Sequence, residues 1–401
     1  MAKTIITLGV GGAGSRLALA FMDEVYASLS GPPTAADSPL FAVSTSGGIL
    51  PRLILVDTDG RAGKAMADVA TSGGRPFQVS SMYMTHGKDS ASRSFGRAYQ
   101  AHVDTRLAIV LDRVQRLIDK HPIDGFLVFH SLAGGTGSGL GAKLVEQLAA
   151  HHAKKSIVTV SLLPSVEAQG SPLDPINAAL ALARIRAKAS MCLLADNDAL
   201  IARCNSSDPG RLDRELARSV GSLGVLLQER TVDLASLQQQ LVSAPMMPYV
   251  MVSRAVSKST SMTGFADRIY SEDGALASYP KAALAKPITG AMLVFRGGAK
   301  ANEVSPVQAA VQKRVVAGGG GLRSHIVSNN QAGFARALHA FSSHAGIGDL
   351  LNSRVLTPFE NLRKHDALLA GVRDDGIEEA ELTRAKTRLI ESIKAYKTVG
   401  A

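Results

Sequence analysis

Two glycine-rich segments have the residue types and the spacing of loops that hold phosphate groups. GVGGAG occupies residues 9–14 and GGTGSG occupies residues 134–139, and each lies between an apolar strand-like run and a helical pattern. Glycine lets a backbone take positive φ and approach a ligand closely, and the free N–H groups at the start of a helix attract anions. Two such loops at strand ends of one sheet predict a single polyphosphate ligand held from two sides.

Each segment by itself leaves alternatives open. GVGGAG matches the dinucleotide-binding pattern GxGxxG, which is weak alone and has a tight structural turn as its alternative. An NAD-type oxidoreductase would need an acidic residue ~20 positions after that loop. Asp57 lies more than forty positions on, which disfavours this class. GGTGSG is not a Walker A loop because no Gly-Lys-Ser/Thr follows it, although Thr136 and Ser138 add hydroxyl donors.

The segments around the loops alternate between strand and helix patterns. The strand-like runs cover residues 4–10, 52–57, 125–130 and 156–163, and the helical patterns cover 15–29, 97–120, 140–153 and 174–188. Such alternation builds a parallel sheet whose ligands lie at the carboxyl ends of the strands. Residues 28–51 are predicted to form a long surface loop.

The pattern changes after about residue 208. Residues 209–228 predict one helix, strand-like runs follow at 248–253, 290–295 and 323–328, a flexible turn is expected at 317–322, and an amphipathic helix closes the chain. The fold prediction is therefore α/β. It has a parallel-sheet, Rossmann-like domain (1–207), a central helix (208–229), a smaller α+β domain (230–345) and a C-terminal helical segment (346–401).

The composition narrows the class of protein. Hydrophobic residues make up 46% of the 401 residues and charged residues 19%, which predicts two or three globular domains. The net charge is +10, but no basic block is interleaved with aromatic residues, so we expect no dedicated nucleic-acid binding. Cys192 and Cys204 allow no disulfide framework and favour a reducing cytoplasm. No run reaches the ~18 apolar residues of a membrane span, and the glycine-broken N-terminus does not read as a signal peptide.

One stretch resembles a family signature closely. HSLAGGTGSG, at residues 130–139, differs only at Ala133 from the tubulin signature HSLGGGTGSG, and its core resembles that of the wider tubulin and FtsZ superfamily. Similar segments follow in the family's order, among them LVDTDG (55–60), DPINA (174–178), ADNDAL (195–200) and TVDLASLQQQLV (231–242). The resemblance runs from residue 4 to about 397 and is thin in the middle. It implies that the first domain binds GTP or GDP with Mg²⁺.

The resemblance also implies which residues would hold the phosphates and the metal ion. The phosphate contacts would come from the two loops: Gly11, Gly12, Ala13, Gly14, Ser15, Ser131, Gly134, Gly135, Thr136, Gly137 and Ser138. Asp59 would lie near magnesium, for which a carboxylate oxygen is a suitable ligand, and its alternative is an acidic turn residue. Asp57 could instead be a strand-end residue that orients the loops. The ten histidines form no HxxxH or HExxH pattern, so no zinc site is expected.

The nucleoside end of the ligand is assigned in the same way. Asp174 and Asn177 belong to the segment that resembles the ribose-side loop, and Asp174 could also cap the helix that begins near Pro175. Asn197 would hydrogen-bond the guanine edge. Asp213, early in the central helix, is the candidate for a second guanine contact, with an exposed helix charge as its alternative.

Hydrolysis in this family is completed by the next subunit, and here the pattern departs from the family. The loop after the central helix has Thr231, Asp233 and Ser236 where the family's active loop has Asn and two acidic residues. Asp233 is the expected catalytic acid, and Glu229 is near enough in sequence to compensate for Ser236. We therefore expect slow GTP hydrolysis, or a site that needs a partner subunit to supply the acid.

Three functions follow as alternatives. The first is a cytoskeletal GTPase that assembles head to tail with itself or a related subunit, since a repeated heterologous contact makes a filament. The second is a GTP-binding regulator or obligate partner subunit that does not polymerise alone, and the third is the disfavoured oxidoreductase. The positive net charge, and the expected lack of the acidic tail of tubulins, favour an acidic protein partner or an anionic membrane face.

Overall fold

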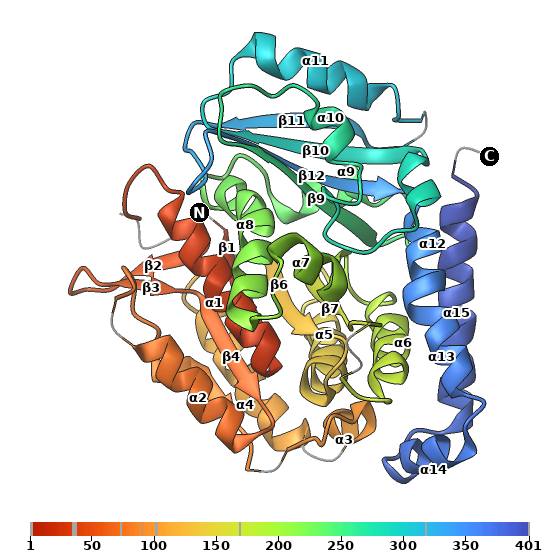
Figure 1. The fold of residues 1–401 in the computed structure, drawn as a ribbon. Coiled ribbons are helices and arrows are strands. Elements are labelled where there is room, and N and C mark those ends of the chain that lie inside the picture. Colours follow the sequence, from red (N-terminus) through yellow and green to blue (C-terminus); the bar gives the residue numbers. More distant parts are fainter. Residues whose placement is uncertain are drawn as a thin grey trace.

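The computed structural model describes residues 3–33, 38–72, 74–88, 90–100, 103–167, 170–316 and 319–399, and is built around one large sheet (Figure 1). Ten strands lie in the order β11-β10-β12-β9-β8-β7-β6-β1-β4-β5. The predicted α/β fold class with a mainly parallel sheet is confirmed.

The parallel part of the sheet carries both glycine segments. Its strands are β1 (Thr4–Val10), β4 (Leu53–Asp57), β5 (Met84–His86), β6 (Ile123–Ser131), β7 (Ser156–Leu163) and β8 (Met191–Asp196). β1 lies between β4 and β6 and is parallel to both. Its residues are buried throughout, as expected for a strand covered on both faces. The glycine segments follow β1 and β6, so they leave the same edge of the sheet side by side.

Helices cover both faces of these strands. They are α1 (Gly11–Ala27), α2 (Gly60–Thr71), α3 (Phe95–Gln100), α4 (Val103–Ile118), α5 (Gly141–His151), α6 (Asp174–Ile185) and α7 (Asn197–Cys204), with short turns η1 (Ser81–Tyr83) and η2 (Thr136–Leu140). Side chains of α1 and α2 pack on one face, and those of α4 and α5 pack on the other. This arrangement leaves the carboxyl edge of the strands to the loops.

The structure corrects two of the predicted segments. Residues 28–51 are not only loop, because β2 (Phe41–Val43) and β3 (Ile49–Pro51) pair as an antiparallel ribbon. Phe41 is fully buried, which anchors the ribbon to the core. The helix predicted over 97–120 is two helices, α3 and α4, and residues 101–102 between them lie outside the described part of the chain. Residues 317–318 of the expected flexible turn also lie outside it, and β11 begins at Gly321.

The second half continues the same sheet beyond α8 (Pro209–Gln228). Its elements are α9 (Leu234–Leu241), β9 (Tyr249–Ser257), α10 (Phe265–Arg268), η3 (Lys281–Ala285), β10 (Ile288–Arg296), α11 (Ala301–Gln312), β11 (Gly321–Val327), β12 (Arg336–His344), α12 (Ile347–Leu351), η4 (Asn352–Leu356), α13 (Thr357–Leu362), α14 (Asp366–Asp374) and α15 (Glu379–Lys397). β9 pairs in parallel with β8, and β12 runs antiparallel to β9 and β10. The strands therefore pass without a break across the predicted boundary between domains, and the boundaries themselves stay a prediction.

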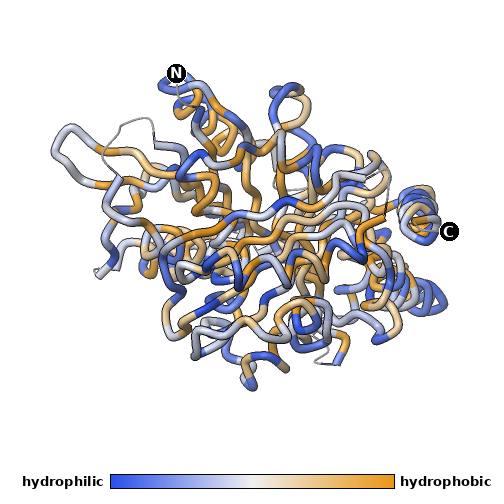
Figure 2. The backbone as a smooth tube through the Cα atoms, turned by 90° about the horizontal axis from the view of Figure 1, so that it is seen from above, coloured by the Kyte–Doolittle hydropathy of each residue, from blue (hydrophilic) through white to orange (hydrophobic). Residues whose placement is uncertain are grey.

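Hydrophobic residues concentrate along the central strands, and hydrophilic residues concentrate on the outer helices and loops (Figure 2). The long helix α8 packs along α1, and its buried residues include Leu216, Val220 and Leu223. The C-terminal helix α15 packs against α6 through Leu382 and Leu389, among others. Among the described residues, no helix has both the length and the apolar character of a membrane span.

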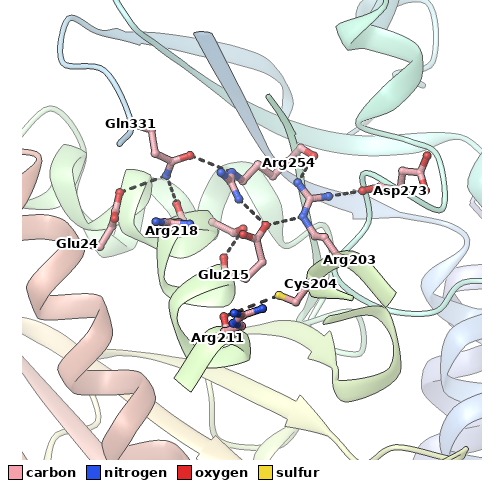
Figure 3. Close-up of polar contacts among 10 residues, drawn as sticks. Glu24, Arg203, Cys204, Arg211, Glu215, Arg218, Arg254, Asp273 and Gln331 are labelled. Atoms are coloured by element: carbon pink, nitrogen blue, oxygen red, sulfur yellow. Dashed lines mark hydrogen bonds and ion pairs between the residues drawn. The ribbon is translucent and has the colours of Figure 1, made fainter. Parts of the chain in front are cut away.

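A buried polar cluster fastens the second half of the sheet to α8 (Figure 3). Glu215 of α8 pairs with Arg203 at 2.5 Å and with Arg254 of β9. Arg254 also donates from Nε to Gln331 Oε1 at 2.9 Å, and Gln331 donates to the carbonyl of Arg218 at 2.8 Å. Because a buried charge that loses its partner is strongly destabilising, this cluster holds α7, α8, β9 and the loop before β12 in one arrangement.

Candidate functional site

The two glycine loops contact each other where β1 and β6 end. Gly11 has φ +75°, a backbone conformation that favours glycine, and a Cβ there would lie 3.1 Å from the backbone nitrogen of Gly137. Gly14 passes so close to β6 that a Cβ would lie 2.2 Å from the carbonyl oxygen of Phe129. The glycines of the first loop thus bring the start of α1 against the second loop, and the two loops form one continuous surface at the carboxyl ends of β1 and β6.

Hydroxyl and carboxylate groups link the second glycine loop to the end of β4. Thr136 donates from Oγ1 to Asp57 Oδ1 at 3.2 Å and lies 2.5 Å from the Thr58 hydroxyl oxygen. The backbone N–H of Asp59 donates to the same Asp57 oxygen at 3.1 Å. Burial raises the pKa of Asp57, and these hydrogen bonds oppose that rise. Asp57 therefore orients the second loop, which agrees with its interpretation as a strand-end residue.

The serine side chains of the loops are hydrogen-bonded to nearby backbone. Ser138 donates to the Gly134 carbonyl at 2.5 Å, and Ser15 donates to the Gly9 carbonyl at 3.2 Å. Ser131 accepts from the Ala133 N–H at 3.2 Å. Five of the predicted phosphate residues are partly exposed: Gly12, Ala13, Ser131, Gly134 and Thr136. The other six are buried: Gly11, Gly14, Ser15, Gly135, Gly137 and Ser138. The ligand roles of all these residues stay predictions, and the observed bonds show that the hydroxyls shape the loops.

A buried histidine that the sequence reading missed supports the second loop. His130 Nδ1 lies 2.9 Å from the Gly137 carbonyl oxygen, so this nitrogen carries the proton, and Nε2 accepts from the Ser161 hydroxyl at 2.8 Å. Burial lowers the pKa of His130 to about 4, which keeps the ring neutral at pH 7. Its position in HSLAGGTGSG was visible in the sequence, but its partners were not.

The predicted ribose side is held by hydrogen bonds that tie three loops together. Asn177 donates to the carbonyls of Arg93 at 2.7 Å and Ala133 at 2.6 Å, and it accepts from the N–H of Phe95 at 3.0 Å. Asp174 accepts from Arg93 Nη2 at 3.1 Å, and burial raises its pKa while Arg93 opposes the rise. Leu173, not Asp174, is the N-cap of α6, so the capping alternative for Asp174 is wrong. The ribose contacts stay predictions.

Asn197 is the first residue of α7 and lies between two anchored carboxylates. Asp196 accepts from the N–H of Ser278 at 2.5 Å, and Asp198 accepts from the N–H of Val166 at 2.9 Å. Arg354, from the C-terminal segment, forms ion pairs with both carboxylates. Contacts with Val166, Ser278 and Arg354 thus fix the backbone around Asn197, which is partly exposed. Its contact with the base stays a prediction.

Asp213 faces the first glycine loop from α8. Its side chain is 9% exposed and accepts from Arg16 Nε at 2.8 Å. The alternative of an exposed helix charge is therefore wrong. Burial raises the pKa of Asp213, and the positive charge of Arg16 opposes that rise. Arg16 was not predicted from the sequence. A positive charge in the first turn of a helix is unfavourable beside the positive end of the helix dipole, so its presence indicates a negatively charged partner nearby.

Asp59 is the N-cap of α2 and its side chain is partly exposed. Its Oδ1 accepts from the N–H groups of Arg61 at 2.8 Å and Ala62 at 3.0 Å, which agrees with the alternative of an acidic turn residue. The hydrogen bond from Ala62 is the main cause that lowers the pKa of Asp59, the bond from Arg61 adds to it, and the carboxylate stays ionised. The described residues contain no cluster of three or more metal-binding side chains. One or two carboxylates suffice for Mg²⁺ when substrate phosphates supply further ligands, so the residues present fit that ion.

The predicted catalytic loop lies at the opposite edge of the sheet. The N–H of Leu234 donates to Asp124 at 3.0 Å, and Asp124 is the second residue of β6. Since β6 rises ~3.3 Å per residue, this loop is roughly 25 Å from the glycine loop at the other end of the same strand. The structure does not bring Asp233 and Glu229 together with the glycine loops of their own chain.

Within that loop, Asp233 and Ser236 form a reciprocal capping box at the start of α9. The N–H of Ser236 donates to Asp233 Oδ1 at 2.7 Å, and the Ser236 hydroxyl lies 3.2 Å from the N–H of Asp233. The hydrogen bond from Ser236 lowers the pKa of Asp233, which is exposed and ionised. Glu229 is also exposed. The carboxylates are therefore accessible to another molecule.

Comparisons with known proteins agree with this geometry. A parallel sheet with helices on both faces and two glycine loops at one edge defines a nucleotide-binding α/β protein. Residues 4–205 match the model of the Tubulin/FtsZ family, GTPase domain, and the chain belongs to that family. This span contains both glycine loops, Asp57 and Asp59, Asp174 and Asn197.

The curated relatives include alpha tubulins. A tubulin alpha chain of Colletotrichum orbiculare is 31% identical over 231 residues, which cover 55% of this chain and 50% of that protein. A tubulin alpha-A chain of Neurospora crassa is 32% identical, with 54% and 49% covered, so these matches span about half the length of the relatives. A tubulin alpha-2B chain of Physarum polycephalum is 26% identical over 401 residues, covering 91% of this chain and 87% of that protein.

Proposed function

We propose that this protein binds GTP or GDP across the paired glycine loops and hydrolyses GTP. The observation that supports the binding site is the contact of the two loops at Gly11 and Gly137, above a base formed by Asp57 and Thr136. The backbone N–H groups of both loops would hold the phosphates, and Asp59 would face the Mg²⁺ that neutralises their charge. Asp174 and Asn177 would bound the ribose side, and Asn197 and Asp213 the base.

Hydrolysis is proposed to need a second subunit. The site and the loop that carries Asp233 lie at opposite edges of one sheet, roughly 25 Å apart by the rise of β6. One chain cannot close that distance, but head-to-tail stacking of copies brings the exposed loop of one onto the glycine loops of the next. Repeated without closure, this contact gives a filament of this subunit or of a related one.

Turnover in such a filament is proposed to be slow. Phosphoryl transfer depends on placing the attacking water and on stabilising the developing charge. Asp233 offers one carboxylate, but Ser236 offers a hydroxyl that is already hydrogen-bonded in the capping box. Glu229 is exposed at the end of α8 and is the remaining acid on the loop.

The test measures GTP turnover per subunit against protein concentration, with sedimentation of the same samples. A steep rise with concentration together with pelletable polymer supports hydrolysis in trans. Polymer with negligible turnover supports filament assembly and indicates that the missing acid at Ser236 makes hydrolysis slow. One bound GTP per chain without polymer favours the regulator or obligate-partner alternative, and no binding rejects the site. The acidic partner and the cytoplasmic location expected from the sequence stay predictions.

A further inference from the structure

One edge of the ten-stranded sheet has no covering strand. β11 is the last strand in the sheet order, beside α11 (Figure 1), and it pairs in parallel with β10 from Gly321 to Val327. Within the described residues, the one further backbone hydrogen bond to β11 comes from Gly297, directly after β10. Every second residue of a strand paired on one side points its N–H and C=O groups away from the sheet. β11 therefore offers a row of unpaired backbone groups.

The edge strand at the other end of the sheet offers much less. β5 has three residues, and two of them are buried. β11 has seven residues, of which only Val327 is buried, and Ile326 is 51% exposed. The helix α11 covers one face near this strand, where Val304 and Val307 join the core, but it leaves Ile326 accessible. A long, accessible edge strand is a template for a strand of another molecule.

The charge around β11 indicates which strand it can accept. Residues 274–348 contain eight lysines and arginines and one acidic residue, Glu303, so this segment carries most of the net charge of +10. Glu303 is already paired with Arg336 at 3.2 Å. The surface around the edge is therefore strongly basic and has few carboxylates of its own.

Three exposed cations lie along this edge. Arg323 belongs to β11 itself. Lys300 directly precedes α11 and lies near the last residue of β11, whereas Lys313 directly follows α11 and lies near the first, because α11 connects the end of β10 to the start of β11. In the part of the chain that the structure describes, none of the three forms an ion pair. Carboxylates of a partner would meet them without competition.

We propose that β11 binds an extended acidic segment of a partner protein as an additional strand of the sheet. The main chain of the partner would bond to the outer backbone groups of β11, and its carboxylates would pair with Arg323, Lys300 and Lys313. An apolar side chain of the partner would cover Ile326. A second copy of this chain is disfavoured, because pairing β11 with β11 would bring two basic surfaces together. The proposal does not depend on the GTP site.

The test measures the binding of three labelled peptides to the full chain without nucleotide, by fluorescence anisotropy. Each has about nine residues, long enough to span β11. The first alternates glutamate with valine, the second has lysine in place of each glutamate, and the third keeps the glutamates but has proline at its centre. The first peptide should bind at least about tenfold more tightly than the other two, because lysine repels the basic edge and proline interrupts strand pairing. It should also slow amide hydrogen exchange in residues 321–327.

Charge reversal at the edge gives the matched pair of variants. Arg323→Glu should weaken the acidic peptide about tenfold and strengthen the lysine peptide. Lys154→Glu makes the same change at an exposed lysine before β7, five strands from β11 and so roughly 24 Å away, and should leave both affinities unchanged.

Two kinds of result overturn the inference. The first is equal binding of the acidic and proline peptides, or binding that leaves amide exchange in β11 unchanged, because the contact would then be one of charge alone. The second is binding of phosphatidylserine vesicles or duplex DNA without binding of the acidic peptide, which would assign the basic surface to a membrane or to nucleic acid. If Arg323→Glu fails to fold, the three peptides with the wild-type chain still decide the question.

Discussion

The two edges of the parallel sheet use their polar groups in opposite ways. At the carboxyl edge, Asp174 and Asp213 are buried and each is paired with an arginine from another element. At the amino edge, Glu229 and Asp233 are exposed, and Asp233 only caps its own helix. Groups that hold a ligand inside one chain must be preorganised, whereas groups offered to a neighbouring chain must stay accessible. The contrast supports a binding site that each subunit completes and a hydrolytic site that it does not.

Asn177→Ala should give the largest effect, at the carboxyl edge. It removes the three hydrogen bonds of a buried side chain and leaves their backbone partners unsatisfied, so the free energy of unfolding should fall by about 3 kcal/mol. GTP affinity should fall as well, because these bonds position the 93–95 segment and the second glycine loop. Urea unfolding measures the first effect. The control is Asn329→Ala, which removes an asparagine that bonds the Ser28 carbonyl outside the site and should cost about 1 kcal/mol.

Asp233→Asn tests the amino edge. Asparagine caps a helix about as well as aspartate, so stability and GTP affinity should not change. Turnover in the polymer should fall about a hundredfold, because the carboxylate that is proposed to position the water is lost. Steady-state GTP hydrolysis above the assembly concentration is the measurement. Unchanged turnover in intact polymer would remove Asp233 from the reaction.

Acid should weaken the carboxyl edge before the amino edge. His130 has a pKa of about 4 when folded against 6.5 for an ordinary histidine, so the unfolded chain binds the proton more readily. Its stabilising contribution is complete above pH 6.5 and falls by about 2 kcal/mol down to pH 5. Asp233, with its pKa lowered, stays ionised over this range. Between pH 6.5 and 5, the free energy of unfolding should fall by about 2 kcal/mol less in His130→Asn than in the wild-type protein. Equal pH dependence in the two proteins would contradict a stabilising role for the neutral histidine.

Ser236→Glu should raise turnover about tenfold. Glutamate at the third helical position also bonds back to the N-cap N–H, so the capping box persists and a carboxylate is added. Ser236→Gln makes the same bond without the charge and serves as the control. Equal rates for the two variants would mean that an acid at this position does not limit hydrolysis.

The smallest effect is expected at Asp59. Asp59→Ala should lower stability by about 1 kcal/mol through the lost cap of α2, whereas Asp59→Asn should leave stability unchanged. Both variants should need more Mg²⁺ for half-maximal GTP binding if Asp59 faces the ion. A titration of Mg²⁺ at fixed GTP gives this value. Wild-type Mg²⁺ dependence in both variants would leave Asp59 as a capping residue alone.

Much of the fold could be predicted because its signals are local. The strand over 156–163 and the helix over 209–228 have the bounds that their apolar patterns predict. Both glycine loops lie at strand ends, as the loop chemistry requires. The ribbon inside residues 28–51 was missed because Gly, Pro, Ser and Thr dominate that segment, while burial of Phe41 depends on residues distant in the chain.

The partners of the site residues could not be predicted. Arg16 and Asp213 are 197 positions apart, and Arg354 meets Asp198 across 156 positions. Neither pairing follows from spacing along the chain. Asn177 lay within a predicted ribose segment, yet its three hydrogen bonds fix neighbouring backbone. Such roles depend on which elements become neighbours in space.

The sequence by itself determined the α/β alternation, the positions of the two glycine loops at strand ends, and the serine at position 236, because periodicity and loop chemistry act over a few residues. Only the tertiary structure decided that the two loops meet, that Asp213 is buried against Arg16, and that Asp233 lies at the far end of β6. These facts depend on strand order and on the direction of each crossover. They become fixed when the whole sheet buries its two faces.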